Sequence, residues 1–262
     1  MGILNVTPDS FYADSRSQTL DAARQHARQL IAEGADMIDL GACSTRPGAE
    51  MVSAEEEWAR LEMGLRAIHE VAPDTIISID TFRADVAEKA VAAGAHIIND
   101  ISGGEMDDAM FETVARLGVP YILMHMQGKP QTMQQDPHYD DLLTEILQYF
   151  ARKVQQLHAL GVKDIILDPG FGFGKTLEHN YELMRRLSDL QELGLPLLVG
   201  ISRKSMLYRL LGTTPQEALN ATTALNTIAL MNGANILRVH DVKECREALQ
   251  VVQALQGKNL NS

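Results

Sequence analysis

The sequence predicts an α/β protein built as a single (β/α)8 barrel, the TIM-barrel architecture, with its active site at the C-terminal ends of the strands. Short apolar runs alternate with longer stretches rich in Ala, Leu, Glu, Gln and Arg. Uninterrupted apolar runs are typical of strands buried on both faces, as in a parallel sheet. A glycine ends most of the longer stretches just before the next run. The 262 residues suit one such barrel, which typically needs about 250.

Each apolar run is expected to form a strand. The runs are 2–6, 36–40, 75–80, 96–101, 119–125, 164–168, 196–201 and 235–239. The intervening stretches favour helix by composition. They include 18–33, 53–72, 83–93, 140–160, 178–193, 215–232 and 243–255. Because glycine tolerates the left-handed conformation that closes a helix, turns are expected at Gly34, Gly94, Gly118, Gly161, Gly194 and Gly233.

No linker or shift in composition divides these units. Residues 1–256 are therefore expected to form one barrel, and residues 257–262 a polar C-terminal tail. An open, doubly wound sheet of eight strands is the structural alternative.

The composition excludes two classes of partner. The chain has 23 Lys and Arg against 35 Asp and Glu, a net charge of −12, which disfavours nucleic acids and acidic membranes. It contains no run of about 18–20 apolar residues that could span a membrane, and no signal segment opens it. Its two cysteines match no zinc spacing. We therefore expect a cytoplasmic protein.

Polar residues gather where the predicted strands end, which is where barrel enzymes place their active sites. Asp80 and Asp168 each close an apolar run, so each carboxylate should point into a dry pocket and require a cationic or ligand partner. Asn5 and Asn99 end two further strands. His125 ends a fifth, where a structural and a chemical role are both open. Other strand-end carboxylates can equally be helix caps or turn formers. They are Asp9, Asp100 and Asp241.

Basic residues follow three strand ends and should converge on the mouth of the barrel. They are Arg46, Arg203, Lys204, Arg238 and His240. In an acidic protein this convergence indicates a bound phosphate or pyrophosphate. The segment Gly170–Lys175 (GFGFGK) lacks the spacing of a P-loop, so no nucleotide site is expected there. The residues alone thus predict a phosphoanion site beside carboxylates and an amide, which suit an aminopyrimidine or guanidine-like ring.

Six motifs in this order resemble the dihydropteroate synthase family across nearly the whole chain. They are GILNVTPDSF at Gly2–Phe11, DLGACSTRPGAE at Asp39–Glu50, SIDTFRADVAEKAVAAGAHIINDISGG at Ser78–Gly104, DPGFGFGK at Asp168–Lys175, GISRKSML at Gly200–Leu207 and RVHDV at Arg238–Val242. The resemblance implies a transferase of folate biosynthesis, and a sulfonamide target, which joins 6-hydroxymethyl-7,8-dihydropterin pyrophosphate to p-aminobenzoate. It also implies a dissociative mechanism through a pterin-methylene cation.

The resemblance further implies a role for each matching position. The pterin would be recognised by Asp80, Asn99, Asp168 and Lys204. The pyrophosphate would be held by Arg238 and His240, with Asn5 on a Mg²⁺ ion. The p-aminobenzoate pocket would be formed by Phe11, Thr45, Arg46, Pro47, Phe173, Lys204 and Ser205. Asp80, Lys204, Arg238 and His240 would be the catalytic set. The resemblance also implies a homodimer, for which the Ala- and Leu-rich stretches 215–232 and 243–255 could supply an apolar face.

Two segments depart from the family pattern. The first loop usually reads Ser-Phe-Ser-Asp-Gly-Gly, and here it reads SFYADS at residues 10–15. The second usually has Gly-Gly-Glu, where this chain has GAC at residues 41–43. A pterin-binding paralogue without turnover is therefore one alternative. Another is a pterin-binding methyltransferase domain, which would have no pyrophosphate to hold and no need of the Ser-Arg-Lys and Arg-Val-His motifs.

Overall fold

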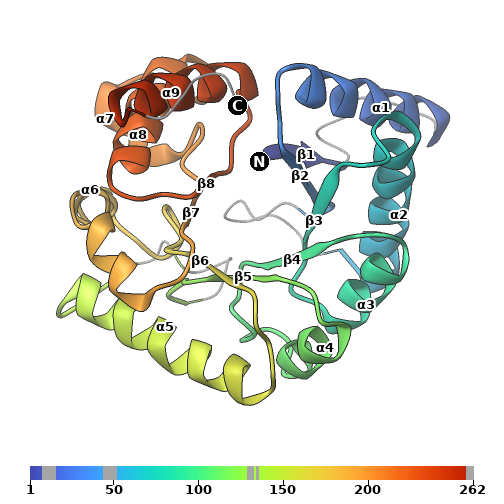
Figure 1. Ribbon diagram of the computed structural model, residues 1–262, viewed down its shortest axis with the longest axis horizontal. Coiled ribbons are helices and arrows are strands. Elements are labelled where there is room, and N and C mark those ends of the chain that lie inside the picture. Colours follow the sequence, from blue (N-terminus) through green and yellow to red (C-terminus); the bar gives the residue numbers. More distant parts are fainter. Residues whose placement is uncertain (8–15, 44–51, 129–132, 134–135, 258–262) are drawn as a thin grey trace.

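The structure, a computed structural model, describes residues 1–7, 16–43, 52–128, 133 and 136–257. Eight strands lie in the order of the chain around a common centre (Figure 1). They are β1 (Gly2–Asn5), β2 (Met37–Gly41), β3 (Ile76–Asp80), β4 (Ile97–Asp100), β5 (Tyr121–Met124), β6 (Ile165–Asp168), β7 (Leu198–Val199) and β8 (Ile236–Leu237). Strands β1 to β6 form one parallel sheet, and β7 pairs with β8 in parallel.

Two isolated bridges close this arrangement into a barrel. Leu167 at β6 pairs with Leu197 before β7, and Gly2 of β1 pairs with Val239 after β8. The predicted closed (β/α)8 barrel is therefore confirmed, and the open-sheet alternative is wrong. Strands β7 and β8 are shorter than the runs that predicted them, because β6 and β1, their neighbours on either side, pair with them only through these single bridges.

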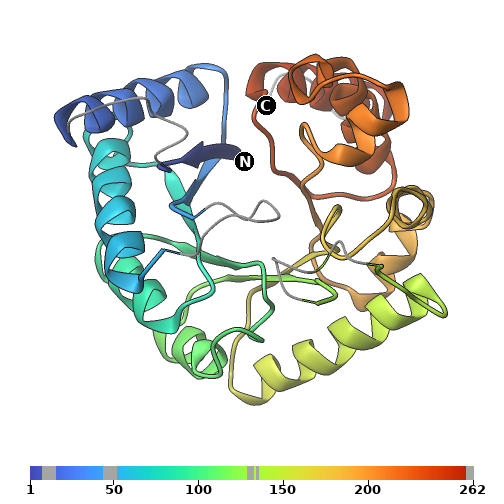
Figure 2. The ribbon, with the colours of Figure 1, turned by 180° about the vertical axis from the view of Figure 1, so that it is seen from behind.

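The helices form an outer ring around the strands, as the two opposite views show (Figures 1 and 2). They are α1 (Arg16–Ala32), α2 (Ala54–Val71), α3 (Ala84–Ala92), α4 (Met110–Leu117), α5 (Leu142–Ala159), α6 (Leu177–Arg185), α7 (Ser205–Leu211), α8 (Leu219–Met231) and α9 (Val242–Leu255). Two 3-10 helices, η2 (Leu187–Leu193) and η3 (Pro215–Glu217), precede β7 and α8. No helix in the described part of the chain is long and apolar enough to cross a membrane.

The helix predictions need two corrections. The predicted helix 178–193 is two elements, because the chain leaves α-helical geometry at Arg186. At this break the Asn232 side chain donates a hydrogen bond to the carbonyl of Met184 at 3.0 Å. Helix α4 was expected only as a helical stretch that ends at Gly118, without further bounds, and α7, which spans seven residues, was not among the predicted stretches. The predicted turn glycines are confirmed, because all six have a positive φ of 66° to 98°.

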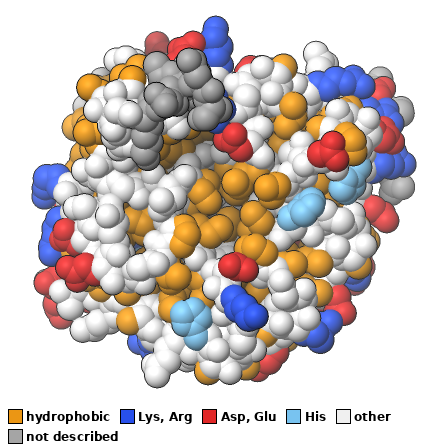
Figure 3. All heavy atoms as spheres, viewed as in Figure 1, with side chains coloured by type: hydrophobic (Ala, Val, Ile, Leu, Met, Phe, Trp, Pro, Cys, Tyr) orange, Lys and Arg blue, Asp and Glu red, His pale blue; other side chains and the backbone are white. Residues whose placement is uncertain are grey.

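The inside of the barrel is divided into two layers. Residues from six strands, including Ile97, Ile122 and Leu198, form an apolar cluster near the amino-terminal ends of the strands. Hydrophobic side chains also gather at the centre of the face seen in Figure 3. Because alternate residues of a strand share a face, the residues two positions further along these strands also point inward. Several of those residues are polar, which places the polar layer toward the carboxyl ends.

The buried face of α5 gives a direct test of the packing between helices and sheet. Leu157 is 0% exposed, whereas Leu160, the residue directly after the same helix, is 42% exposed. We predict that Leu157→Ala lowers the free energy of unfolding by about 2–5 kcal/mol, through lost burial and a cavity. The matched control Leu160→Ala should change it by less than about 0.5 kcal/mol. Urea titration measures both, and similar losses would contradict this packing.

Candidate functional site

Four neighbouring strands bring polar groups side by side at the carboxyl end of the barrel. The parallel register pairs Asn5 with Gly41, Gly41 with Asp80, and Asp80 with Asn99. A Cβ atom on Gly41 would lie 3.0 Å from the Asn5 Oδ1 and 3.6 Å from the Cβ of Asp80. The glycine therefore leaves open the space between an amide oxygen and a carboxylate.

The Asp39 carboxylate, beneath this row, has no exposed surface. It accepts hydrogen bonds from Ser78 Oγ at 2.7 Å and from Asn99 Nδ2 at 3.2 and 3.3 Å. It also accepts one from Arg238 Nε, and Arg238 Nη2 donates to Asp80 Oδ2 at 3.2 Å. One guanidinium thus joins two carboxylates inside the barrel. Burial acts to lower the pKa of Arg238, but Asp39 and Asp80 outweigh it and raise that pKa, so the side chain stays charged.

Asp80 is poised to change its charge near neutral pH. Its burial is the main cause that raises the pKa of this carboxyl to about 7. Arg238 acts in the opposite direction, and the negative charge of Asp39 adds to the rise. A carboxylate held this way is short of positive partners, so a ligand that offers N–H donors or positive charge would be favoured there.

The second half of the site is the turn that follows β6. Asp168 is 6% exposed, and its Oδ1 accepts a hydrogen bond from the backbone N–H of Gly170 at 2.8 Å. Burial raises the pKa of Asp168, while the nearby Lys204 opposes the rise. Lys204 Nζ donates to the Phe171 carbonyl at 2.6 Å and lies 4.7 Å from the centre of the Phe173 ring. Burial lowers the pKa of Lys204 to about 8, with Asp168 acting against it.

Of the remaining predicted site residues, two are described by the structure and four are not. Ser205 is the first residue of α7, directly after Lys204, and His240 is exposed after β8, with its backbone N–H donating to Ser202 Oγ at 3.2 Å. Four predicted residues lie outside the described part of the chain. They are Phe11, Thr45, Arg46 and Pro47.

Arg203 was predicted to converge with the other cations, but it is paired elsewhere. Its guanidinium donates to the carboxylate of Asp241, in one contact at 3.1 Å. Asp241 is therefore an ion-pair partner. Asp100 is a turn former, because its two oxygens accept the backbone N–H groups of Ser102 at 2.7 Å and Gly104 at 2.9 Å.

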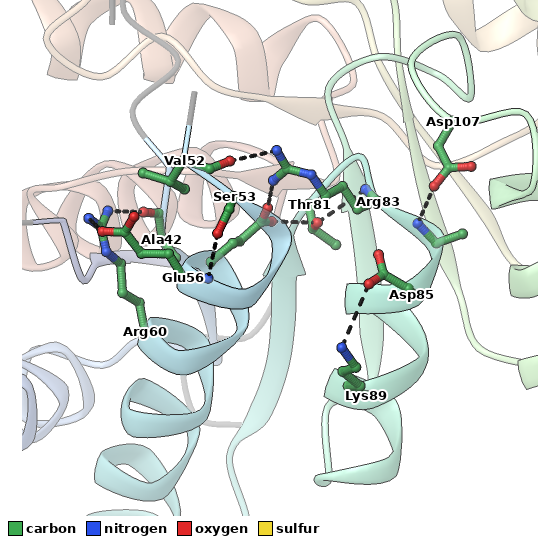
Figure 4. A network of polar contacts seen from close by, with 12 residues as sticks. Ala42, Val52, Ser53, Glu56, Arg60, Thr81, Arg83, Asp85, Lys89 and Asp107 are labelled. Atoms are coloured by element: carbon green, nitrogen blue, oxygen red, sulfur yellow. Dashed lines mark hydrogen bonds and ion pairs between the residues drawn. The ribbon is translucent and has the colours of Figure 1, made fainter. Parts of the chain in front are cut away.

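Arginines fix the chain on both sides of residues 44–51, the segment that contains three predicted site residues (Figure 4). Arg60 of α2 donates to the carbonyl of Ala42 at 3.1 Å, and Arg83 donates to the carbonyl of Val52 at 2.7 Å. The buried Glu57 carboxylate contacts Arg83 and accepts a hydrogen bond from Thr81 Oγ1 at 2.6 Å. Thr81 follows Asp80, so this network links the ends of the segment to β3.

Asp39 is the residue of this site that sequence reasoning missed. It lies in the middle of an apolar run, at an inward-facing position between Met37 and Gly41. An isolated carboxylate inside a buried strand is itself a signal, because such a group needs a cationic or hydrogen-bonding partner.

Comparison with known proteins gives one consistent result. The family model described as pterin binding enzyme matches residues 1–240. The dihydropteroate synthase of Escherichia coli (strain K12) is 48% identical over 256 residues, which cover 97% of this chain and 90% of that protein. The Synechocystis dihydropteroate synthase is 45% identical over 258 residues, covering 97% and 89%.

Solved structures agree with these relatives. A Yersinia pestis dihydropteroate synthase in complex with a sulfonamide drug superposes with a TM-score of 0.91 at 46% identity, covering 98% of this chain and 94% of that one. The Thermus thermophilus dihydropteroate synthase in complex with 4-aminobenzoate superposes with a TM-score of 0.87 at 40% identity, covering 97% and 93%.

The shared guanidinium predicts how Asp39 controls Asp80. We predict that Asp39→Asn lowers the pKa of Asp80, because a repelling charge is removed and Arg238 can pair more fully with Asp80. Carbon-13 NMR of the aspartate carboxyls measures this pKa. The control is Asp36→Asn, since Asp36 is exposed before β2 and pairs with Arg246; this change should leave Asp80 unaffected. A pKa of Asp80 that stays the same or rises in Asp39→Asn would refute the shared-cation arrangement.

Proposed function

The chain belongs to the pterin-binding enzyme family, and on this premise we propose that it works as a dihydropteroate synthase. The reaction joins 6-hydroxymethyl-7,8-dihydropterin pyrophosphate to p-aminobenzoate and releases pyrophosphate. The observation that carries the proposal is that the half-buried Asp80 and the buried Asn99 and Asp168 lie at one end of the barrel with Lys204 and Arg238. A cytoplasmic location is part of the proposal, supported by two free cysteines, Cys43 and Cys245.

The buried carboxylates and amide suit the edge of an aminopyrimidine ring. Asp168 and Asp80 are acceptors that burial leaves short of positive partners, and the amino and ring N–H groups of a pterin are donors. Asn99 can accept with its oxygen while its nitrogen stays bonded to Asp39. Lys204 would donate to the O4 and N5 side of the ring. Hydrogen bonds from the bound pterin would thus offset the free-energy cost of keeping these polar groups away from water.

The pyrophosphate end of the substrate would meet Arg238 and His240. Arg238 is held by Asp39 through Nε and by Asp80 through Nη2, which leaves Nη1 to donate to an anion. Because two carboxylates fix the plane of the guanidinium before the substrate arrives, little side-chain freedom is lost on binding. His240, exposed at the same strand end, can add a second donor.

The residues present fit a Mg²⁺ ion that arrives with the substrate. The described residues contain no group of three or more His, Cys, Asp or Glu that could hold a metal. Asn5 offers one hard oxygen ligand next to the space that Gly41 leaves open. Mg²⁺ commonly binds through one or two protein oxygens plus phosphate oxygens and water. When bound, the ion would neutralise charge on the leaving pyrophosphate.

The proposed mechanism is dissociative. Asp80 supplies fixed negative charge as the pterin-methylene carbon becomes cationic, and Arg238 and His240 hold the departing anion. The nitrogen lone pair of p-aminobenzoate then forms the new C–N bond and loses a proton. Phe173, Lys204 and Ser205 would line the pocket for this second substrate. Phe11, Thr45, Arg46 and Pro47, which lie outside the described residues, remain predicted members of the same pocket.

A pyrophosphate-release assay tests this function. Release should require the pterin pyrophosphate and Mg²⁺, and dihydropteroate should form only when p-aminobenzoate is added. Binding of the pterin without any turnover would identify a non-catalytic paralogue. Methyl transfer from a methylated tetrahydrofolate would instead support the methyltransferase alternative, which the arginine at position 238 and the lysine at position 204 disfavour.

The two shifted pKa values predict a narrow pH optimum. Asp80 has a pKa of about 7 and must be ionised, so kcat/KM for the pterin substrate should fall as the pH drops below that value. Lys204 has a pKa of about 8 and must be protonated, so kcat/KM should fall as the pH rises above it. In Lys204→Arg, which stays charged, residual activity should lose the alkaline limb. A wild-type profile that is flat from about pH 6 to about pH 9 would contradict these roles.

The homodimer is also a proposal, supported by exposed apolar side chains on α7, α8 and α9. These three helices lie next to one another in the ring of helices (Figure 1). Large hydrophobic residues on α7, α8 and α9 are 44% to 72% exposed. They are Leu210, Leu211, Ile228, Met231, Val251 and Leu255. An apolar surface of this kind is typical of a protein interface.

A charge placed on these helices should separate the subunits. We predict that the wild type sediments as a dimer and that Met231→Glu sediments as a monomer with an unchanged circular dichroism spectrum. Leu160→Glu, at an exposed leucine directly after α5, is the matched control and should remain dimeric. A wild type that is monomeric at micromolar concentration, or a dimeric Met231→Glu variant, would argue against an interface at α8.

A further inference from the structure

A buried lysine, Lys175, lies beneath the glycine-rich turn after β6 and has no part in the mechanism above. Its side chain is 2% exposed. Its Nζ lies 3.0 Å from His125 Nδ1, 3.1 Å from the Gly170 carbonyl oxygen and 3.2 Å from the Phe173 carbonyl oxygen. An ammonium group has three N–H donors and no acceptor, so these three acceptors match it one for one. A neutral amine would leave one of them without a donor.

His125 is suited to accept from this lysine. It is 5% exposed, and the ring of Tyr149 packs edge-on against it at 4.9 Å. Burial, with the adjacent charge of Lys175, keeps the pKa of His125 well below its ordinary value. The ring is therefore neutral, and Nδ1 accepts from Lys175 when the ring proton is on Nε2. This contact gives His125 a defined role, which the sequence left open.

The turn depends on such support because its backbone is unusual. Gly170, Gly172 and Gly174 all have a positive φ, of 69°, 80° and 59°. A Cβ atom on Gly170 would lie 1.9 Å from the His125 carbonyl oxygen, so the turn is pressed against the end of β5. Asn180 Oδ1 accepts from the Gly172 N–H at 2.7 Å and Tyr139 donates to the Gly174 carbonyl at 2.7 Å. Lys175 adds a charged donor to the carbonyls of Gly170 and Phe173.

The opposite side of the same turn carries part of the proposed site. The Phe171 carbonyl accepts from Lys204, and the Phe173 ring packs against the Lys204 ammonium group. The carbonyl of Phe173 in turn accepts from Lys175. Two lysines thus donate to the backbone of the turn, Lys175 to the carbonyls of Gly170 and Phe173 and Lys204 to the carbonyl of Phe171.

We propose that Lys175 is a positioning residue, which holds the turn so that Phe173 and Lys204 form the p-aminobenzoate pocket. The proposal rests on the function proposed above. Of the proposed pterin-recognition residues, Asp80 and Asn99 lie on β3 and β4, whereas Asp168 and Lys204 are bonded to the turn. Phe173, whose carbonyl accepts from Lys175 directly, belongs only to the proposed p-aminobenzoate pocket, so use of p-aminobenzoate should depend on Lys175 more than pterin binding does. Burial lowers the pKa of Lys175 to about 7, opposed by Asp168 and helped by Lys204. Variants are therefore compared at one fixed pH.

Lys175→Met tests the proposal, because methionine is similar in length but has no donor. We expect the KM for p-aminobenzoate to rise by about tenfold, as for the loss of a hydrogen bond from a charged group, while the Kd of a pterin without phosphates changes less than about threefold. Lys163→Met, which removes an exposed lysine before the other end of β6, is the control and should behave as the wild type. Unchanged kinetics in Lys175→Met, or equal losses for both ligands, would overturn the proposal.

Two His125 variants provide a second test if Lys175→Met does not fold. His125→Leu removes one acceptor and should raise the KM for p-aminobenzoate, whereas His125→Asn retains an acceptor and should restore most of it. Equal effects of the two changes would count against the proposal. The wild type is assayed first, since a wild type that releases no pyrophosphate rejects the proposed function itself. Even in that case, crystal structures of Lys175→Met and Lys163→Met would test whether Lys175 positions the turn, because Phe173 should be displaced only in Lys175→Met.

Discussion

The guanidinium of Arg238, held between Asp39 and Asp80, is the interaction on which the rest of the site depends. Two carboxylates in a barrel interior would repel each other and lose hydration, and one cation between them offsets both costs. The same carboxylate of Asp39 also orients Ser78 and Asn99. Side chains from β2, β3, β4 and β8 are thereby fixed to one another before any ligand binds. Removal of one member would leave the others buried and unbalanced, which costs far more than the pair contributes when complete.

Closure of the barrel is what makes this arrangement possible. Asp39 and Arg238 are 199 positions apart in the chain, and they meet because β8 returns to lie beside β1. The apolar layer below them, which includes Ile97, Ile122 and Leu198, excludes water from the lower half of the barrel. Electrostatic interactions in the layer above are therefore stronger than at a protein surface. The shift in the pKa of Asp80 follows from this burial.

The sequence predicted the strands well because a buried parallel strand is an uninterrupted apolar run, which local composition reveals. It singled out Asp80 and Asp168 because each closes an apolar run, and Asn99 because it lies near the end of a predicted strand; their roles in binding stay predictions. It set no bounds for α4 beyond the turn at Gly118 and did not predict α7, because both are too short to show a clear helical period. It also missed Asp39, whose importance lies in a partner that is brought near only by the closed fold. Arg203 was placed in the anion site by its position at a strand end, but its pairing with Asp241 is decided by the local loop geometry.

The arrangement of charges in the described site explains how it can favour a cation in one place and an anion in another. Asp39 and Asp80 are paired with Arg238, and Asp168 lies near Lys204, so the acidic groups of the site are partly neutralised although the whole chain carries −12. Within the site the charges are separated, with carboxylates beside the pterin and the guanidinium toward the leaving group. When the C–O bond breaks, the cation forms near Asp80 and the anion departs past Arg238. Fixed charges that are already oriented need not rearrange in that step, which is how preorganised electrostatics lowers a barrier.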